Sequence, residues 1–376
     1  MAAHLPVDGV MAPWSKRLEA RPALELADSC LRGVGQVVFM NNPVTGLLIL
    51  AGLTVASAWL GLATALGAVA ATLTALALGF DRTAVRAGLF GFNGALCGAG
   101  LATFFAPQLS ADGMVWIVVV AAFSTVITAT LARILVPTFG VPGLTLPFNL
   151  ATLTFLLAAF AFASDELALA ADPALPALGQ AVDTTLRAEM DGSGASAAGA
   201  VLNALLRGVG QVFLADSAIA GLLIVAGITV CSRIAAGFAL VGSLVGLLVA
   251  LAVGADGFAA YHGLWAYNSV LCAIAVGGVF FVLTWRSALA AVACAAAGAL
   301  LFAAVGTLLA PLGLPGLTLA FCLATLAFLL IKDDTPRLQP VDLAEVTTPE
   351  AHRHAARPPA GAPTGRDPRV GGNSPS

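Results

Sequence analysis

Charged residues are scarce in this chain of 376 residues: Asp, Glu, Lys and Arg make up 10% of it, whereas 59% is hydrophobic. A soluble domain carries about 25% charged residues, so the composition excludes a water-soluble fold of this length. Runs without any charge occupy residues 44–80, 113–131 and 263–285, and a membrane-crossing helix needs about 20 apolar residues. The sequence therefore predicts an all-α polytopic membrane protein.

Patterns typical of enzymes and metalloproteins are also missing. The sequence contains neither HExxH nor GxSxG, and its six cysteines form no CxxC pair. Two copies of GVGQV resemble the start of a dinucleotide fingerprint, but Val38 and Phe213 stand where GxGxxG requires its third glycine. We therefore expect no catalytic site, metal or cofactor, and no nucleic acid as a partner. A membrane enzyme would need a nucleophile–base pair or a metal set within the spans.

Ionisable side chains are nearly absent from the apolar runs. The runs contain no acidic pair and no lysine, His262 lies at the edge of one segment, and Asp216 stands just before another. Because intramembrane ionisable residues mark ion and proton pathways, we expect a small, neutral, polar solute and no coupling to an ion gradient. Asp216 is interpreted as the N-cap of the following helix. The alternative is an ion-coupled secondary transporter of another small neutral polar solute, with a titratable or sodium-binding site at the helix breaks.

The sequence does contain an internal duplication. VPGLTLPFNLATLTFLL, which begins at Val141, recurs as LPGLTLAFCLATLAFLL from Leu314, and the segments that begin at Arg32 and Leu89 recur in the same order. The material after residue 331 is Pro-rich and poor in apolar residues, which is typical of disorder. The predicted organisation is an N-terminal segment (1–17), a first transmembrane repeat (18–163), an extracytoplasmic linker (164–198), a second transmembrane repeat (199–331) and a disordered cytoplasmic tail (332–376).

The charges outside the apolar runs are distributed unevenly. The linker carries six acidic residues and a single arginine, whereas lysines and arginines flank the N-terminus and follow residue 331. Positively charged flanks stay cytoplasmic, so both termini are expected inside and the linker outside. Each repeat then crosses the membrane an odd number of times, with about five transmembrane helices, and the two repeats are inverted. Proteins built in this way carry their solute site near the midplane at the repeat interface, where we expect a central pore.

Each repeat opens with a helix-breaking motif. GVGQV begins at Gly33 and again at Gly208, and an Asn-Pro pair follows soon after the first copy. Because glycine and proline weaken helices, we predict a re-entrant half-helix in each repeat. A surface loop followed by an ordinary span is the alternative. Broken backbone at membrane depth is tolerated where it is buried or lines a wet path, and the equivalent Gln36 and Gln211 are predicted to line that path.

A second motif places an aromatic ring before an asparagine, as Phe92-Asn93 in the first repeat and Tyr267-Asn268 in the second. An ordinary core position is the alternative interpretation for each ring. An asparagine inside a span needs a hydrogen-bond partner. Its presence in both copies indicates that it caps a helix end.

The third motif is a Pro-Gly break followed by a threonine, Thr145 in one repeat and Thr318 in the other. Proline removes an amide donor and frees an upstream carbonyl, so hydroxyl and carbonyl oxygens gather at the start of an apolar helix. Inverted repeats place the two threonines face to face across a pseudo-twofold axis, as one symmetric polar constriction. The alternative is that each hydroxyl bonds only its own helix backbone.

Together these motifs resemble the doubled signature of the urea transporter family, carried by residues 142–148 and 315–321, by RGVGQVVFMNNPVTG and by GLWAYNSVLC. The resemblance extends over residues 32–331. It implies a channel-like facilitator of the cell (inner) membrane that works as a homotrimer with one urea path in each subunit. It also implies two flat slots for planar urea on either side of Thr145 and Thr318. The slot residues would be Gln36, Val37, Phe39, Phe92 and Leu96 in one repeat, and Gln211, Val212, Tyr267 and Leu271 in the other.

Two positions depart from the repeated pattern and affect the geometry of the slots. Ala320 stands where the first copy has Pro147, and Leu214 replaces the aromatic ring of Phe39. Urea carries four N–H donors and a carbonyl, so its dehydration is costly unless the pore returns the hydrogen bonds. Stacking surfaces and oxygen acceptors, without a ring of carboxylates, suit such a neutral solute.

Overall fold

The computed structural model describes residues 7–18, 21–106, 108–161 and 196–356. Apart from one isolated bridge between Phe281 and Pro340, the regular elements of these ranges are all helices. Most of the predicted linker and the end of the predicted tail lie outside the described residues, so the extracytoplasmic placement of the linker stays a prediction.

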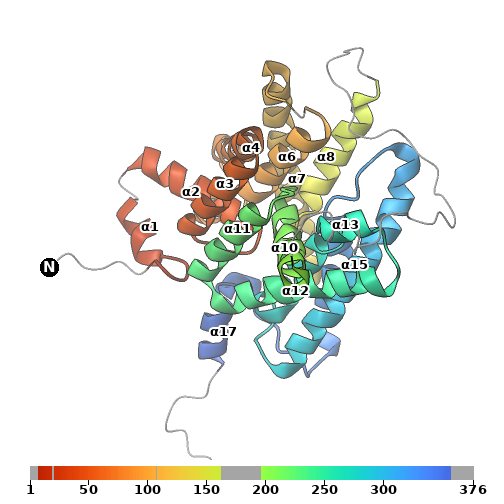
Figure 1. The fold of residues 1–376 in the computed structure, drawn as a ribbon. Helices are drawn as coiled ribbons and strands as arrows, with labels where there is room; N and C mark the ends of the chain where they lie inside the picture. Colours follow the sequence, from red (N-terminus) through yellow and green to blue (C-terminus); the bar gives the residue numbers. More distant parts are fainter. Residues whose placement is uncertain (1–6, 19–20, 107, 162–195, 357–376) are drawn as a thin grey trace, which may run out of the picture.

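The same series of helices occurs twice along the chain (Figure 1). We call residues 22–159 the first half and residues 197–330 the second half. After α1 (Ala12–Leu18), the first half contains α2 (Pro22–Gln36), α3 (Pro43–Ala56), α4 (Ala58–Ala77), α5 (Arg82–Arg86), α6 (Gly91–Phe104), α7 (Ala111–Phe139) and α8 (Leu146–Ala159). The second half contains α10 (Ala197–Gly210), α11 (Ala218–Cys231), α12 (Arg233–Ala252), α13 (Gly257–Tyr261), α14 (Tyr267–Ile274), α15 (Trp285–Leu309) and α16 (Leu319–Leu330), with short turns between them: η1 (Gln211–Phe213), the π-helical η2 (Ala275–Val279) and η3 (Ala310–Leu312).

The break at the start of each half follows from local chemistry. In the first half, a Cβ atom at Gly35 would collide with the carbonyl oxygen of Met40, so only glycine lets the chain fold back at this point. Asn42 then starts α3 by accepting hydrogen bonds from the amides of Val44 and Thr45. In the second half, the helix that ends at Phe213 and the helix that follows it are bent by 75°.

Several helices are long and apolar enough to cross a membrane. Within the described residues these are Ala58–Ala77, Ala111–Phe139, Arg233–Ala252 and Trp285–Leu312, with a fifth if the bent pair Ala197–Phe213 and Ala218–Cys231 counts as one span. Only 28% of the most apolar window of α7 is buried inside the protein. An apolar face of that size is suited to lipid rather than water, and the chain has the build of a multi-pass membrane protein.

The two halves pack directly against each other. Helices α3 and α11 lie side by side (Figure 1), and the Thr45 hydroxyl of α3 donates a 2.6 Å hydrogen bond to the Gly227 carbonyl of α11. A methyl group added at Gly52 or Gly227 would come within 3.1 Å of a backbone oxygen of the opposite helix. These glycines therefore permit the close backbone approach that joins the halves.

The segment after residue 331 differs from the prediction. Residues 332–356 are folded, with short helices at η4 (Lys332–Asp334), η5 (Leu343–Glu345) and α17 (Pro349–Ala355). Their backbone pairs with the second half through Val282 N–H to the Gln339 carbonyl and Val341 N–H to the Phe280 carbonyl, both 2.9 Å. The expectation of disorder from residue 332 onward is therefore wrong for this part, which we call the C-terminal strap (332–356).

Two polar side chains hold the C-terminal strap in place. Glu350 accepts hydrogen bonds from the Ser232 hydroxyl (2.7 Å) and the Ile234 amide (2.9 Å) at the N-terminus of α12, where a carboxylate is favoured by the helix dipole. His352 is buried. Its Nε2 accepts the Thr347 amide, so its Nδ1 donates to the Gly278 carbonyl at 2.9 Å.

Candidate functional site

The centre of the site lies where the N-termini of α8 and α16 meet. Thr145 and Thr318 are the residues immediately before these helices, and each is 3% exposed. Their hydroxyl oxygens are 2.7 Å apart, so one donates a hydrogen bond to the other. The two threonines that we expected to meet, from the repeated motif, are therefore in contact. Each hydroxyl has a partner outside its own helix.

Two further side chains complete this central cluster, and sequence reasoning missed both. Asn149 and Cys322 occupy equivalent positions one turn into α8 and α16. The Asn149 amide donates to the Thr145 carbonyl (2.8 Å) and to the Thr318 hydroxyl (3.0 Å), and the Cys322 sulfur lies 3.2 Å from the Thr145 hydroxyl. The Asn149 Oδ1 atom is buried and has no hydrogen-bond partner within the described residues. A polar residue four positions after Thr145 in an apolar helix was the available signal.

The asparagines of the second motif cap the two central helices. Asn93 Oδ1 accepts the Phe148 amide of α8 at 3.2 Å, and Asn268 Oδ1 accepts the Phe321 amide of α16 at 2.9 Å. Both asparagines are fully buried. These bonds agree with the prediction that the asparagines cap a helix end. Each asparagine, however, caps a neighbouring central helix, α8 or α16, and not its own helix, α6 or α14.

The predicted slot residues of α6 and α14 lie next to these caps. Leu96 and Leu271 are buried, and Phe92 is half-buried. Tyr267 is 5% exposed, packs edge-on against Phe302, and donates a 2.6 Å hydrogen bond from its hydroxyl to the Leu317 carbonyl. The second half therefore places a hydroxyl where the first half has only a benzene ring.

The predicted slot residues of the half-helix segments occupy equivalent positions in the two halves. The Gln36 amide donates to the Ala87 carbonyl at 2.9 Å, and the Gln211 amide donates to the His262 carbonyl at 3.0 Å. Val37 and Val212 are buried beside them. These bonds orient the two glutamines and tie each break to the turn before α6 or α14.

Phe39 was predicted to line the same slot as Phe92, but its ring contacts the other half of the chain. Its ring lies edge-on to Phe280 and Phe321, with centroid distances of 5.6 and 6.1 Å, so it contacts the second half of the chain. The backbone φ angle is positive at Phe39 (65°) and at its counterpart Leu214 (60°). The turn is therefore the same in both copies, although only one of them presents an aromatic ring.

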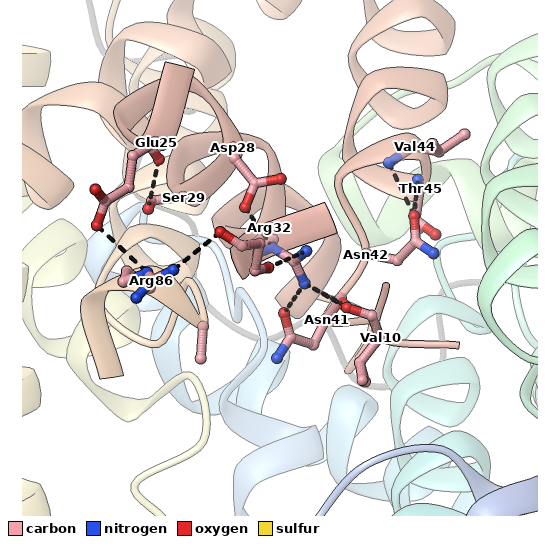
Figure 2. Close-up of polar contacts among 12 residues, drawn as sticks. Val10, Glu25, Asp28, Ser29, Arg32, Asn41, Asn42, Val44, Thr45 and Arg86 are labelled. Atoms are coloured by element: carbon pink, nitrogen blue, oxygen red, sulfur yellow. Dashed lines mark hydrogen bonds and ion pairs between the residues drawn. The ribbon is translucent and has the colours of Figure 1, made fainter. Parts of the chain in front are cut away.

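Among the described residues, charged side chains gather near the breaks between α2 and α3 and between α10 and α11, and not at the threonines. Arg32, only 2% exposed, bonds Asp28 at 2.7 Å, the Asn41 side chain at 2.7 Å and the Val10 carbonyl at 2.9 Å (Figure 2). Figure 2 also shows the Asn42 side chain turned toward the first amides of α3. The N-terminal segment therefore contributes a carbonyl to this buried arginine.

The equivalent arginine of the second half has different partners. Arg207 bonds Asp216 at 2.9 Å, and His262 Nδ1 lies 2.6 Å from the other oxygen of that carboxylate. The interpretation of Asp216 as an N-cap is wrong, because Ser217 caps α11. Its carboxylate is held by Arg207 and His262, and a bound arginine competes better for a carboxylate than a backbone amide does.

Comparison with known proteins assigns the chain to one family. A family model described as "Urea transporter" matches residues 27–333. The chain is 35% identical to the protein named Urea transporter 1 of Ovis aries over 357 residues, covering 92% of this chain and 88% of that protein. The protein of the same name from Mus musculus is 36% identical over 356 residues, with the same coverage of both chains.

The match covers the helices that carry the threonines, the asparagines and the half-helix breaks. The chain belongs to the urea transporter family. Members of this family are transporters and not enzymes.

Proposed function

We propose that this protein mediates channel-like, facilitated diffusion of urea across the membrane, down the urea gradient. The path runs between the two halves, with Thr145 and Thr318 at its constriction. Membership of the urea transporter family supports urea as the permeant. The observation that carries the proposal is the 2.7 Å contact between the two threonine hydroxyls, which come from opposite halves and are both buried.

The chemistry of the central cluster suits a neutral solute that is rich in N–H donors. The threonine hydroxyls and the free Asn149 Oδ1 are acceptors in an otherwise apolar surrounding. When urea passes, the bond between the hydroxyls is exchanged for bonds to urea, so dehydration is partly offset. Within the described residues, the side-chain groups that contact the threonine hydroxyls are the other hydroxyl, an amide and a thiol, and no carboxylate or amine is among them. This favours permeation of a neutral molecule without an ion.

The slots on either side of the constriction follow from the same arrangement. In one half Gln36, Val37, Phe39, Phe92 and Leu96 are proposed to line the path, and in the other half Gln211, Val212, Tyr267 and Leu271 are proposed to do so. Their buried aliphatic and aromatic surfaces would hold planar urea by contact and not by strong bonds. Weak binding of this kind lets a permeant leave as well as enter.

We further propose that the halves are inverted repeats with re-entrant half-helices, and that both termini are cytoplasmic. Both ends of the described chain attach to the junction of α11 and α12. Gly9 N–H donates to the Cys231 carbonyl at 3.2 Å, and Glu350 binds at Ser232. Termini on one side require an even number of crossings in total, which two repeats with five crossings each provide. We also propose that the protein is a homotrimer in the cell (inner) membrane, and this proposal is based on the family resemblance alone.

Purified protein in liposomes tests the proposal. We expect urea flux that is well above that of protein-free liposomes, follows the urea gradient, and is unchanged by a protonophore or by removal of sodium. Flux no faster than in protein-free liposomes would contradict urea permeation. Uphill accumulation driven by a pH or sodium gradient would instead assign the protein to the ion-coupled class.

A further inference from the structure

One backbone carbonyl in each half lies just before a central helix and outside its hydrogen-bond ladder. Phe148 and Phe321 are the third residues of α8 and α16, so their amides have no partner within the helix. Both amides bond asparagine side chains instead. Leu144 and Leu317, which have positive φ angles of 49° and 45°, therefore present carbonyl oxygens that their own helices do not use.

The carbonyls of Leu144 and Leu317 differ in their hydrogen-bond partners. The Leu317 carbonyl accepts the Tyr267 hydroxyl at 2.6 Å and lies 3.5 Å from the Asn268 amide nitrogen. In the first half, Asn93 turns its amide to the Thr128 hydroxyl at 3.1 Å, and Phe92 has no hydroxyl to donate. No hydrogen bond to the Leu144 carbonyl is found within the described part of the chain.

The position of these carbonyls relates them to the proposed path. Leu317 directly precedes Thr318, and the tip of the Tyr267 ring reaches its carbonyl oxygen. This carbonyl therefore faces the ring that is proposed to line the slot of the second half. In the first half, Leu144 directly precedes Thr145, and Phe92 occupies the sequence position equivalent to Tyr267.

We propose that Tyr267 is a specificity-determining residue of the urea path, an inference that rests on the proposed function. Its hydroxyl donates to the Leu317 carbonyl, so the slot of the second half presents a phenol oxygen, a weaker acceptor, in place of that carbonyl. The Leu144 carbonyl stays open in the first half. The path consequently offers a stronger acceptor for N–H groups on one side of the threonines than on the other.

The consequence is a reduced preference for solutes with many donors. Urea brings four N–H donors to the slot, whereas acetamide brings two and a methyl group. An additional open carbonyl acceptor would return a hydrogen bond to urea more often than to acetamide. With Tyr267 in place, we therefore expect a lower ratio of urea flux to acetamide flux than if the carbonyls of Leu144 and Leu317 were both open.

The test is this flux ratio, measured for both solutes on the same proteoliposome preparation so that protein content cancels. Tyr267→Phe opens the Leu317 carbonyl, and we expect the urea-to-acetamide ratio to rise by roughly two- to twelve-fold, the effect of one neutral hydrogen bond. Phe92→Tyr places a hydroxyl beside the Leu144 carbonyl and should lower the ratio. The double variant should return it toward the starting value.

The other tyrosine of the chain provides a matched control. The Tyr261 hydroxyl accepts a bond from the Asn203 amide, 2.9 Å away, and takes no part in the proposed slots. Tyr261→Phe should leave the ratio unchanged. A ratio that stays constant in folded Tyr267→Phe protein, or that falls, would overturn the role of Tyr267 while urea flux in the unmodified protein still upholds the proposed function. If Phe92→Tyr fails to fold, Tyr267→Phe alone decides.

Discussion

At the scale of single residues, the central threonines are partners of each other across the two halves. Replacing either one with valine keeps the volume and removes a hydroxyl that urea is proposed to use at the constriction. A neutral hydrogen bond contributes about 0.5–1.5 kcal/mol, so we expect Thr145→Val and Thr318→Val each to slow urea flux by roughly two- to twelve-fold. Stopped-flow measurement of urea efflux from proteoliposomes gives the rates, and the double variant should be slower than either.

Thr64 supplies the control for this experiment. It is buried like the central threonines, but its hydroxyl bonds the Leu60 carbonyl of its own helix at 2.7 Å. Thr64→Val should leave flux nearly unchanged. Rates close to those of the unmodified protein in well-folded Thr145→Val and Thr318→Val would remove the threonines from the mechanism.

The pairing of Thr145 and Thr318 could be predicted because the same motif occurs twice in the sequence and the two copies were expected to be inverted. Asn149 could not be found in this way, since its counterpart is Cys322 and the repeat gives no signal where the copies differ. The contacts of the Phe39 ring with Phe280 and Phe321 were equally hidden. They join residues of different halves, and sequence periodicity carries no information on packing between halves.

At the scale of elements, the Glu350 carboxylate of the C-terminal strap contributes two of the contacts that hold the strap, both at the start of α12. Glu350→Ala removes two hydrogen bonds to a charged group, each worth about 1.5–3 kcal/mol. We expect the strap to open at least ten-fold more often, because even one such bond exceeds the free energy of a ten-fold change. Amide hydrogen exchange of Val341 and Thr347, whose N–H groups bond the rest of the protein or His352, should accelerate accordingly.

A second acidic residue of the strap serves as the comparison. Glu345 is exposed and lies in the short turn η5. Glu345→Ala should leave the exchange rates of both amides unchanged. Equal exchange in the Glu350→Ala variant and the unmodified protein would show that other contacts hold the strap.

Helices and their breaks were largely predictable, because glycine, proline and apolar runs act through local backbone chemistry. The fold of residues 332–356 was not. Its composition is polar and Pro-rich, and its order depends on a few specific contacts, above all those of Glu350 and His352. Composition averages over such contacts and therefore predicted disorder.

At the scale of the whole molecule, the proposed inversion predicts which surfaces face which side. All six native cysteines are buried, so single cysteines can be introduced at exposed positions without a strong background. Ala198→Cys, at the start of α10, and Arg353→Cys, in the C-terminal strap, both occupy exposed positions. In sealed vesicles, an impermeant thiol reagent should label these two variants from opposite sides of the membrane.

Labelling of both positions from the same side would contradict the inverted arrangement and the placement of the linker outside. Permeabilised vesicles provide the reference, since both cysteines should then react. The result bears on the proposed path as well, because the proposed inversion would explain why the two threonine helices meet at the centre.

The hydrogen bond from Thr45 to Gly227 has a consequence for biosynthesis. Its two residues are separated by 182 positions, and ribosomes add about 5–20 residues per second. Roughly ten to forty seconds therefore pass between the synthesis of α3 and that of its partner α11. During this interval the face of α3 that carries Gly52 lacks its partner α11, so the first half must stay in the membrane with this face uncovered until the second half is made.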